Sequence, residues 1–302
     1  MAIGYLFSGQ GAQAVGMGRS LYDNIPVARE LYDRADAVLG WKLSKICFEG
    51  PEAELTQTRV CQPALFVQGC AIAAALKASG GVEAPAACLG LSLGELTALT
   101  VAEAYSFEDG LQVVAERGRL MQEACDQTDG AMASMIGGSV EGVESLCAEF
   151  DVDMANLNCP GQIVISGESA KVAKAVEAAQ ASGNFRMVVP LKVAGAYHSR
   201  LMEPAREAFA RYLQDIPLQS PKVPVFTNTT GQQVSEPAAI REALAKQVVS
   251  SVLWEDCMRN AAALGIETFY ECGPGAVLSG LARRIDRQIK VVPIAESDQL
   301  PS

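Results

Sequence analysis

A serine within a Gly-x-Ser-x-Gly pattern and a single histidine are the residues of this chain best suited to covalent chemistry. Ser92 lies in Gly90-Leu91-Ser92-Leu93-Gly94, and His198 is the one histidine among 302 residues. A serine hydroxyl becomes an effective nucleophile when a neighbouring base accepts its proton. If Ser92 acts with a histidine, the partner must therefore be His198.

The residues on either side of Ser92 predict the setting that such a nucleophile needs. Residues 86–90 are typical of a short buried strand, and residues 95–99 of the first turns of a helix. A tight strand-to-helix turn with flanking glycines exposes the serine at the edge of the sheet. The pattern alone is weak, because composition produces a chance match in about one such chain in seven. The alternative is that Ser92 is only the N-cap of the helix.

Arg117 is a candidate ligand for an anion. It belongs to a helix predicted to begin after a capping box at Ser106. At about 100° per residue, Arg117 falls between Val113 and Met121 on the apolar face. A buried guanidinium needs an anion or several acceptors. Arg117 therefore forms either a structural ion pair with a buried acid or a two-pronged contact with a substrate carboxylate.

His198 and two candidate donors complete a possible reaction centre. No acid at a clear strand end precedes His198, so we expect a serine–histidine dyad whose ring is oriented by a backbone carbonyl or an amide. A tetrahedral intermediate also needs hydrogen-bond donors for its oxyanion. The backbone N–H of Leu93 is one candidate, and Gln10, in the turn after the first strand, is the other. Parallel strands end at the same edge of a sheet, which would bring Gln10 near Ser92.

The order of the predicted elements indicates an α/β protein with a largely parallel sheet. Between residues 129 and 192 the pattern changes to strand-helix-strand-strand-helix-strand, the ferredoxin-like order. We therefore predict a core formed by residues 1–127 and 195–302, with residues 128–194 inserted as a ferredoxin-like subdomain. The reactive residues would face the cleft between the two, a common place for a ligand site.

Composition excludes several classes of protein. A net charge of −11 argues against a nucleic-acid partner. The start of the chain is not typical of a signal peptide, and no uninterrupted run of about 18 apolar residues predicts a membrane span. Nine cysteines without a Cys-x-x-Cys pair, together with one histidine, predict no metal site. Their odd number and apolar surroundings indicate reduced thiols in the cytoplasm.

Short motifs along nearly the whole chain, from about residue 3 to 285, together resemble one enzyme family. Their joint order is far more specific than any one of them. The family is that of the malonyl-CoA:acyl carrier protein transacylases, with the acyltransferases of polyketide synthases as relatives. The motifs are Phe7-Ser8-Gly9-Gln10-Gly11-Ala12-Gln13, Gln62-Pro63-Ala64, Gly90-Leu91-Ser92-Leu93-Gly94-Glu95, Arg117, Asn158-Cys159-Pro160-Gly161-Gln162, Gly195-Ala196-Tyr197-His198-Ser199, Gln247-Val248-Val249-Ser250, Trp254-Glu255-Asp256 and Gly273-Pro274-Gly275.

The resemblance implies a hydrolase-like α/β core with the inserted ferredoxin-like subdomain, and a monomer that needs no cofactor. It implies that Ser92 takes a malonyl group from malonyl-CoA as an ester, with His198 as base and then acid. The phosphopantetheine thiol of acyl carrier protein then attacks this ester, in a ping-pong scheme that supplies fatty acid synthesis.

Further roles follow from the same resemblance. Arg117 would hold the free malonyl carboxylate, and Gln10 with the Leu93 amide would form the oxyanion hole. Gln247 would lie close to the serine–histidine pair. Asn158 would line the cleft where pantetheine enters.

Two residues depart from the usual family pattern. Leu91 stands where histidine is frequent, which removes a polar neighbour of the nucleophile. Tyr197 stands where phenylalanine is usual in malonyl-selective members. The tyrosine retains the bulk that should exclude an α-methyl branch, so malonyl remains the expected substrate rather than methylmalonyl.

Other functions and surfaces remain open from the sequence. The chain could be a discrete polyketide acyltransferase, or a serine hydrolase or thioesterase, although hydrolysis of a neutral acyl chain needs no buried arginine. A carrier-binding protein without catalysis is disfavoured by the intact set of Ser92, His198 and Gln10. An acidic carrier protein requires a basic surface on this chain. The alternative is that the basic side chains are ordinary surface charges that keep the protein soluble. The basic residues that could provide it are Lys192, Arg200, Arg206, Arg283 and Arg284.

Overall fold

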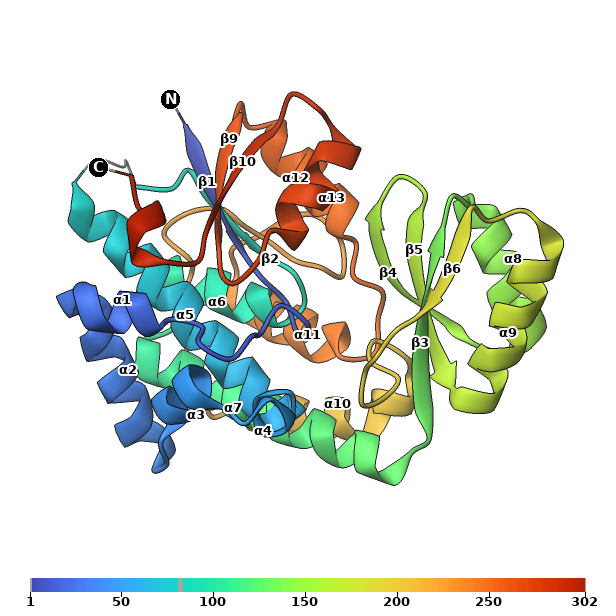
Figure 1. Cartoon of the computed structure of the whole chain (residues 1–302), viewed down its shortest axis with the longest axis horizontal. Helices are drawn as coiled ribbons and strands as arrows, with labels where there is room; N and C mark the ends of the chain where they lie inside the picture. The colour runs from blue at the N-terminus through green and yellow to red at the C-terminus, as the bar shows by residue number, and fades with distance from the viewer. Residues whose placement is uncertain (1, 81–83, 302) are drawn as a thin grey trace.

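Two β-sheets with flanking helices make up the structure, a computed structural model that describes residues 2–80 and 84–301 (Figure 1). The larger sheet has the strand order β10-β9-β1-β2-β7-β8. Its pairs are parallel except for β7 with β8, as predicted for the core. The strands are β1 (Ile3–Phe7), β2 (Ala87–Gly90), β7 (Val225–Phe226), β8 (Gln233–Val234), β9 (Thr268–Cys272) and β10 (Lys290–Ile294).

Helices cover both faces of this sheet, which explains why its central strands are apolar throughout. Successive side chains of β1 point to opposite faces, and all five of its residues are buried. Tyr5 and Phe7 pack in the cluster that contains α5, whereas Leu6 packs in the cluster of α12 and α13. The helices around the larger sheet are α1 (Arg19–Asn24), α2 (Pro26–Leu39), α3 (Leu43–Glu49), α4 (Glu52–Leu55), α5 (Thr58–Ser79), α6 (Leu93–Val101), α7 (Phe107–Gln127), α10 (Glu203–Tyr212), α11 (Pro237–Gln247), α12 (Trp254–Ala262) and α13 (Val277–Ile285), with short 3₁₀ turns at Arg200–Met202 and Ser297–Gln299.

The smaller sheet is antiparallel, with the order β4-β5-β3-β6. Along the chain its elements follow the predicted strand-helix-strand-strand-helix-strand order, and its two helices pack on one face (Figure 1). The ferredoxin-like unit is therefore confirmed as part of the fold, while its boundaries at 128 and 194 stay a prediction. Its elements are β3 (Gly130–Ile136), α8 (Val140–Phe150), β4 (Asp153–Cys159), β5 (Gln162–Glu168), α9 (Ser169–Ser182) and β6 (Met187–Pro190).

Helix α5 needs separate mention because it is long and apolar enough to cross a membrane by length and composition alone. The sequence has no uninterrupted apolar run of that length, but scattered polar residues do not lower its mean hydropathy enough to fail this test. In the fold, 89% of the apolar window is buried inside the protein. The apolar composition of α5 is thus explained by its place between α2, α7 and the sheet.

Candidate active site

The turn between β2 and α6 holds Ser92 in a conformation that non-glycine residues rarely adopt. Its φ is 54° and its ψ is −105°, a strained geometry of the kind found at functional sites. A Cβ on Gly90 would lie 1.8 Å from the carbonyl carbon of Gly94, and one on Gly94 would lie 2.2 Å from the Phe7 oxygen. Glycine is therefore required on both sides of Ser92, as the nucleophile-elbow hypothesis predicts.

We expect Gly90→Ala to lower the free energy of unfolding by at least about 3 kcal/mol, because the new methyl group would overlap backbone that cannot move independently. Urea denaturation measures this loss. Gly280→Ala in α13 is the matched control, since a Cβ there meets none of the described atoms within 4 Å. The control should be neutral or slightly stabilising, and an equal loss in both variants would reject the steric argument.

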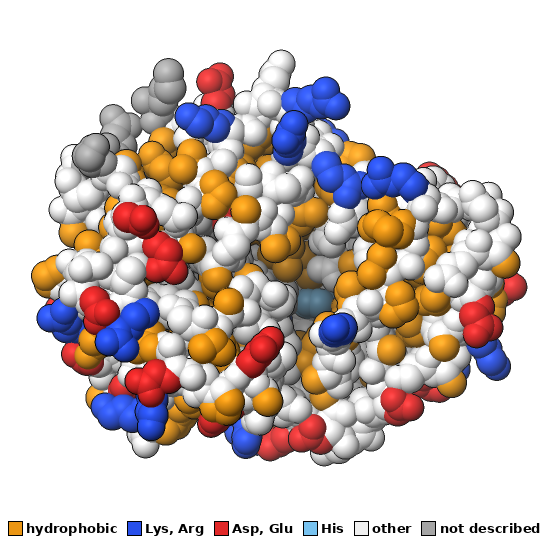
Figure 2. All heavy atoms as spheres, in the orientation of Figure 1, with side chains coloured by type: hydrophobic (Ala, Val, Ile, Leu, Met, Phe, Trp, Pro, Cys, Tyr) orange, Lys and Arg blue, Asp and Glu red, His pale blue; other side chains and the backbone are white. Residues whose placement is uncertain are grey.

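Ser92 and His198 lie side by side, as a serine–histidine pair in a chain with one histidine must. Ser92 Oγ lies 2.8 Å from His198 Nε2, and His198 Nδ1 lies 2.8 Å from the backbone oxygen of Gln247. The carbonyl can only accept, so Nδ1 carries the proton and Nε2 is free to accept the Ser92 hydroxyl proton. Figure 2 shows the histidine, in pale blue, at the floor of a hollow.

Burial, and then the charge of Arg117, lower the pKa of His198 to about 4. The imidazole is therefore neutral at pH 7 and ready to accept a proton. The geometry confirms that a backbone carbonyl orients the ring, as expected when no acid was found for this role. The pair can thus function as a general base and a nucleophile.

Arg117 is 1% exposed and directs its guanidinium at Ser92. Nη2 donates to Ser92 Oγ at 3.1 Å and to Gln247 Oε1 at 2.8 Å, and Nη1 donates to Gln62 Oε1 at 2.8 Å. All three partners are neutral, and the buried Nε has no hydrogen-bond partner among the described residues. Burial lowers the pKa of Arg117 to about 10, so the group remains charged at pH 7. The arrangement is a buried cation beside the nucleophile, and within residues 2–80 and 84–301 it is not the direct ion pair considered as its alternative.

Gln247 lies next to the serine–histidine pair, where the family resemblance implies it should be. Besides its contacts with His198 and Arg117, its Nε2 donates to the Ser92 backbone oxygen at 3.0 Å. The same Nε2 donates to Glu95 Oε2 at 2.6 Å. Gln247 thus hydrogen-bonds to His198, Arg117 and Glu95 and to the backbone of Ser92.

Glu95 and Asn228 belong to this centre, although sequence reasoning assigned no role to either. Glu95 Oε2 accepts from the Asn228 backbone N–H at 2.9 Å, and Asn228 Oδ1 accepts from the Ser92 backbone N–H at 2.6 Å. Glu95 carries a usable signal in the sequence, because it is a charged residue in an otherwise apolar helical turn. Asn228 carries none, since it follows a short strand 136 positions after Ser92.

The two expected oxyanion donors differ in how the structure places them. Leu93 is the first residue of α6, where backbone N–H groups have no partner within the helix. The side-chain amide of Gln10 donates instead to Tyr197 Oη at 3.2 Å and to Thr58 Oγ1 at 3.4 Å. In this arrangement the side chain of Gln10 is directed away from the role expected for it, and its part in an oxyanion hole stays a prediction.

Asn158 lies on β4, the edge strand of the smaller sheet that packs against α12 and α13 of the core. Its side chain is buried, and its Oδ1 has no hydrogen-bond partner within the part of the chain that the structure describes. This places Asn158 at the junction of the two units. Its assignment to a pantetheine cleft stays a prediction.

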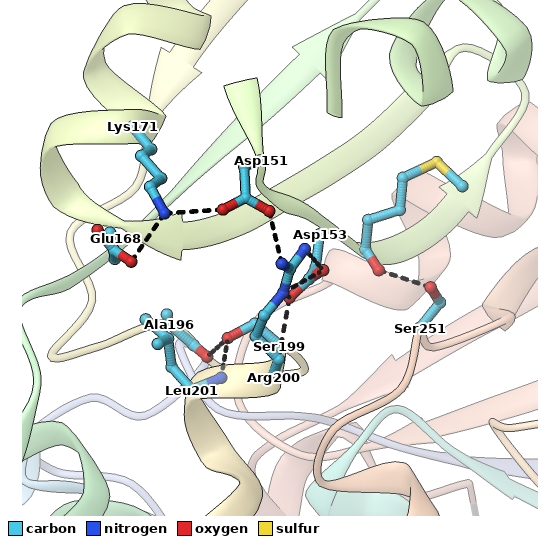
Figure 3. A network of polar contacts seen from close by, with 10 residues as sticks. Asp151, Asp153, Glu168, Lys171, Ala196, Ser199, Arg200, Leu201 and Ser251 are labelled. Carbon is cyan, nitrogen blue, oxygen red and sulfur yellow. Dashed lines mark hydrogen bonds and ion pairs between the residues drawn. The ribbon is translucent and has the colours of Figure 1, made fainter. Parts of the chain in front are cut away.

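The basic residues expected to meet a carrier protein are partly engaged within the chain. Arg200 binds Asp151 and Asp153 at 2.6 and 2.7 Å, in a network that continues to Lys171 and Glu168 (Figure 3). Further pairs in the same set are Arg206 with Glu203, and Arg284 with Gln162 and the carbonyls of Pro160 and Gly161. Arg200 and Arg284 thus join the inserted unit to the core.

A strained serine at the end of a strand of a parallel sheet, with a neutral histidine beside it, is the arrangement of an α/β enzyme that can use serine as a nucleophile. Residues 4–298 match the family model described as the acyl transferase domain. The chain therefore belongs to the acyl transferase family, and it is an acyltransferase.

Individual relatives are similar over nearly the whole chain. The malonyl CoA-acyl carrier protein transacylase of Bacillus subtilis (strain 168) is 40% identical, over 99% of this chain and 95% of the relative. The polyketide biosynthesis malonyl CoA-acyl carrier protein transacylase of the same strain is 38% identical, over 96% and 99%. A solved complex of a type II polyketide acyl carrier protein with its malonyl-transacylase aligns with a TM-score of 0.95, at 34% identity, over 99% of this chain and 98% of that chain.

Proposed function

We propose that this chain transfers a malonyl group from malonyl-CoA to the phosphopantetheine thiol of acyl carrier protein. Ser92 Oγ attacks the thioester carbonyl carbon while His198 Nε2 accepts the hydroxyl proton. The carbon–sulfur bond breaks, and coenzyme A leaves with that proton from His198. In the second half-reaction the carrier thiol gives its proton to His198 and attacks the ester, and Ser92 recovers the proton as the new thioester forms.

The observation that carries this proposal is the position of the Arg117 guanidinium, 3.1 Å from Ser92 Oγ and surrounded by neutral partners. A malonyl ester on Ser92 has a carboxylate one methylene beyond its carbonyl carbon. A buried guanidinium next to the ester is within reach of that carboxylate, and a planar fork binds it through two parallel bonds. Because partners such as Gln62 are neutral, an incoming carboxylate can replace them as acceptors of the Arg117 hydrogen bonds at little electrostatic cost.

Transfer is favoured over hydrolysis by the same residue. Release of a neutral acyl chain by water gains nothing from a buried cation, which costs free energy to desolvate. The carrier protein is the proposed acceptor, since similar proteins carry that partner in their names. Both half-reactions exchange one thiol or hydroxyl for another at the same carbonyl carbon, so the transfer requires no cofactor.

We place the activity in fatty acid synthesis, with a polyketide pathway as the alternative. The two Bacillus subtilis relatives differ by only two percentage points of identity, 40% and 38%, so similarity alone does not separate these pathways. The kcat/KM values with a fatty acid and a polyketide carrier protein test the choice. The nine cysteines are all buried and unpaired, which fits the proposed cytoplasmic location. We further propose that the enzyme is a monomer.

Arg117→Ala should reduce malonyl transfer by roughly 2–4 kcal/mol in kcat/KM, the scale for truncating one side of a buried charge pair. Transfer of acetyl, which has no free carboxylate, should fall far less or rise. Arg117→Lys should restore only part of the malonyl activity, because an ammonium cannot reproduce the planar fork. Steady-state kinetics with malonyl-CoA and acetyl-CoA measure the selectivity.

Arg119→Ala is the matched control for this experiment. Arg119 lies on the same helix, but it is exposed and paired with Glu116 and Glu123. The control should keep the activity with both substrates. Equal losses of malonyl and acetyl transfer in Arg117→Ala would make Arg117 a structural residue and remove the main support for malonyl as substrate.

A further inference from the structure

We propose that Glu95 is a positioning residue for the active site: its carboxylate holds Gln247 and Asn228 in the orientations that place Arg117, His198 and Ser92. This inference rests on the proposed transfer through Ser92. Glu95 lies in the first turn of α6 and is 2% exposed. Its Oε2 accepts two hydrogen bonds, from Gln247 Nε2 at 2.6 Å and from the Asn228 backbone N–H at 2.9 Å.

The first arm of this arrangement sets the orientation of the Gln247 amide. An ionised carboxylate only accepts, so the amide must turn its NH₂ group toward Glu95. Its Oε1 then faces Arg117, from which it accepts at 2.8 Å. A flipped amide would place NH₂ against a guanidinium that also only donates. The backbone oxygen of the same residue binds His198 Nδ1, so a displaced Gln247 would also disturb the histidine.

The second arm supports the strained turn at Ser92. Asn228 Oδ1 accepts from the Ser92 backbone N–H at 2.6 Å, and Asn228 Nδ2 donates to the Gly90 oxygen at 2.9 Å. Asn228 therefore clamps the backbone on both sides of Leu91. Glu95 in turn accepts a hydrogen bond from the Asn228 backbone N–H. The same buried carboxylate therefore helps to stabilise the unfavourable φ of Ser92.

Burial raises the pKa of Glu95 to about 7, against the lowering effect of the bonds from Asn228 and Gln247 and of the Arg117 charge. The other titratable groups that sense its charge are Cys257 on α12 and Tyr105. Burial raises the pKa of each of these two groups above its ordinary value, so both are neutral near pH 7. Protonation at lower pH would remove the negative charge that strengthens both hydrogen bonds and would add an O–H donor to the carboxyl group, so the orientation of the amide would no longer be fixed. Acylation should therefore increase with pH through about 7, well above the titration of His198 near 4.

The test measures the first half-reaction alone, where no carrier thiol titrates. Wild type and Glu95→Gln are mixed with malonyl-CoA or acetyl-CoA between pH 5.5 and 9, and the acyl-enzyme is followed by rapid quench and intact mass. In Glu95→Gln we expect both acylation rates to fall by the same factor, about 10²-fold, since small misplacements of reacting groups have effects of this size. We also expect the rise near pH 7 to be present in the wild type and absent in the variant.

Glu271→Gln is the matched control. Glu271 is another fully buried carboxylate, but it accepts from the backbone N–H groups of Leu278 and Ser279 at the start of α13. Neutralising it should lower the unfolding midpoint without changing the acylation rates or their pH profile. The control separates the cost of losing a buried charge from a loss of positioning.

Three results would overturn the inference: unchanged acylation in Glu95→Gln, a loss confined to malonyl, or the same loss in Glu271→Gln. If Glu95→Gln does not fold, the pH profile of the wild-type acylation rate tests the inference by itself. A rate that stays constant between pH 6 and 8 rejects the role of Glu95. Absence of any wild-type acyl-enzyme would instead reject the proposed function. The two failures are thus distinguishable.

Discussion

Ser92→Ala is expected to form no acyl-enzyme with malonyl-CoA, and kcat should fall by about 10⁶, the scale seen when a serine enzyme loses its nucleophile. The reason is geometric as well as chemical. Ser92 Oγ lies 2.8 Å from His198 Nε2 and 3.1 Å from Arg117 Nη2, at the end of β2. Intact mass after incubation with malonyl-CoA measures the ester, and steady-state kinetics measure kcat.

The fold of Ser92→Ala should be unaffected, because alanine can occupy the same backbone geometry at a cost similar to that of serine. Ser182→Ala, at the end of α9 in the inserted unit, is a control that should acylate normally. A malonyl mass increase on the Ser92→Ala protein would show that another residue is the nucleophile.

His198→Ala should slow both half-reactions by about 10²–10⁴-fold, the usual contribution of a general base. The Ser92 hydroxyl would lose the group that accepts its proton, and the leaving thiol would lose its acid. Single-turnover rates of acyl-enzyme formation and of transfer to acyl carrier protein measure the two steps separately. Near-normal rates in either step would mean that another base serves Ser92.

The pH dependence of the free energy of unfolding of the same variant tests the lowered pKa of His198. The folded pKa of about 4 lies below the ordinary value of 6.5, so the unfolded chain binds the proton more readily. This group contributes stability above pH 6.5 that is lost as the pH falls toward 4. His198→Ala should therefore lose less free energy of unfolding than wild type over this interval. Parallel curves for the two proteins would contradict the lowered pKa.

The sequence by itself determined the features that depend on local order and on residue counts. The glycines around Ser92 predicted the strained turn, because short-range backbone sterics govern it. A single histidine left one partner for the serine. Helical periodicity predicted the burial of Arg117, and the alternation of strands and helices predicted both the parallel sheet and the inserted ferredoxin-like order.

Only the tertiary structure decided how these residues are held. His198 is oriented by a backbone carbonyl, which any residue type could supply, so the identity of Gln247 carries no sign of that contact. The side chain of Gln10 turns to Tyr197 and Thr58, which no local pattern predicts. Glu95 reaches Gln247 across 152 positions of the chain. Such contacts arise when distant segments pack together, because the acceptors that satisfy a buried polar group are chosen by proximity in the fold and not by neighbours in the sequence.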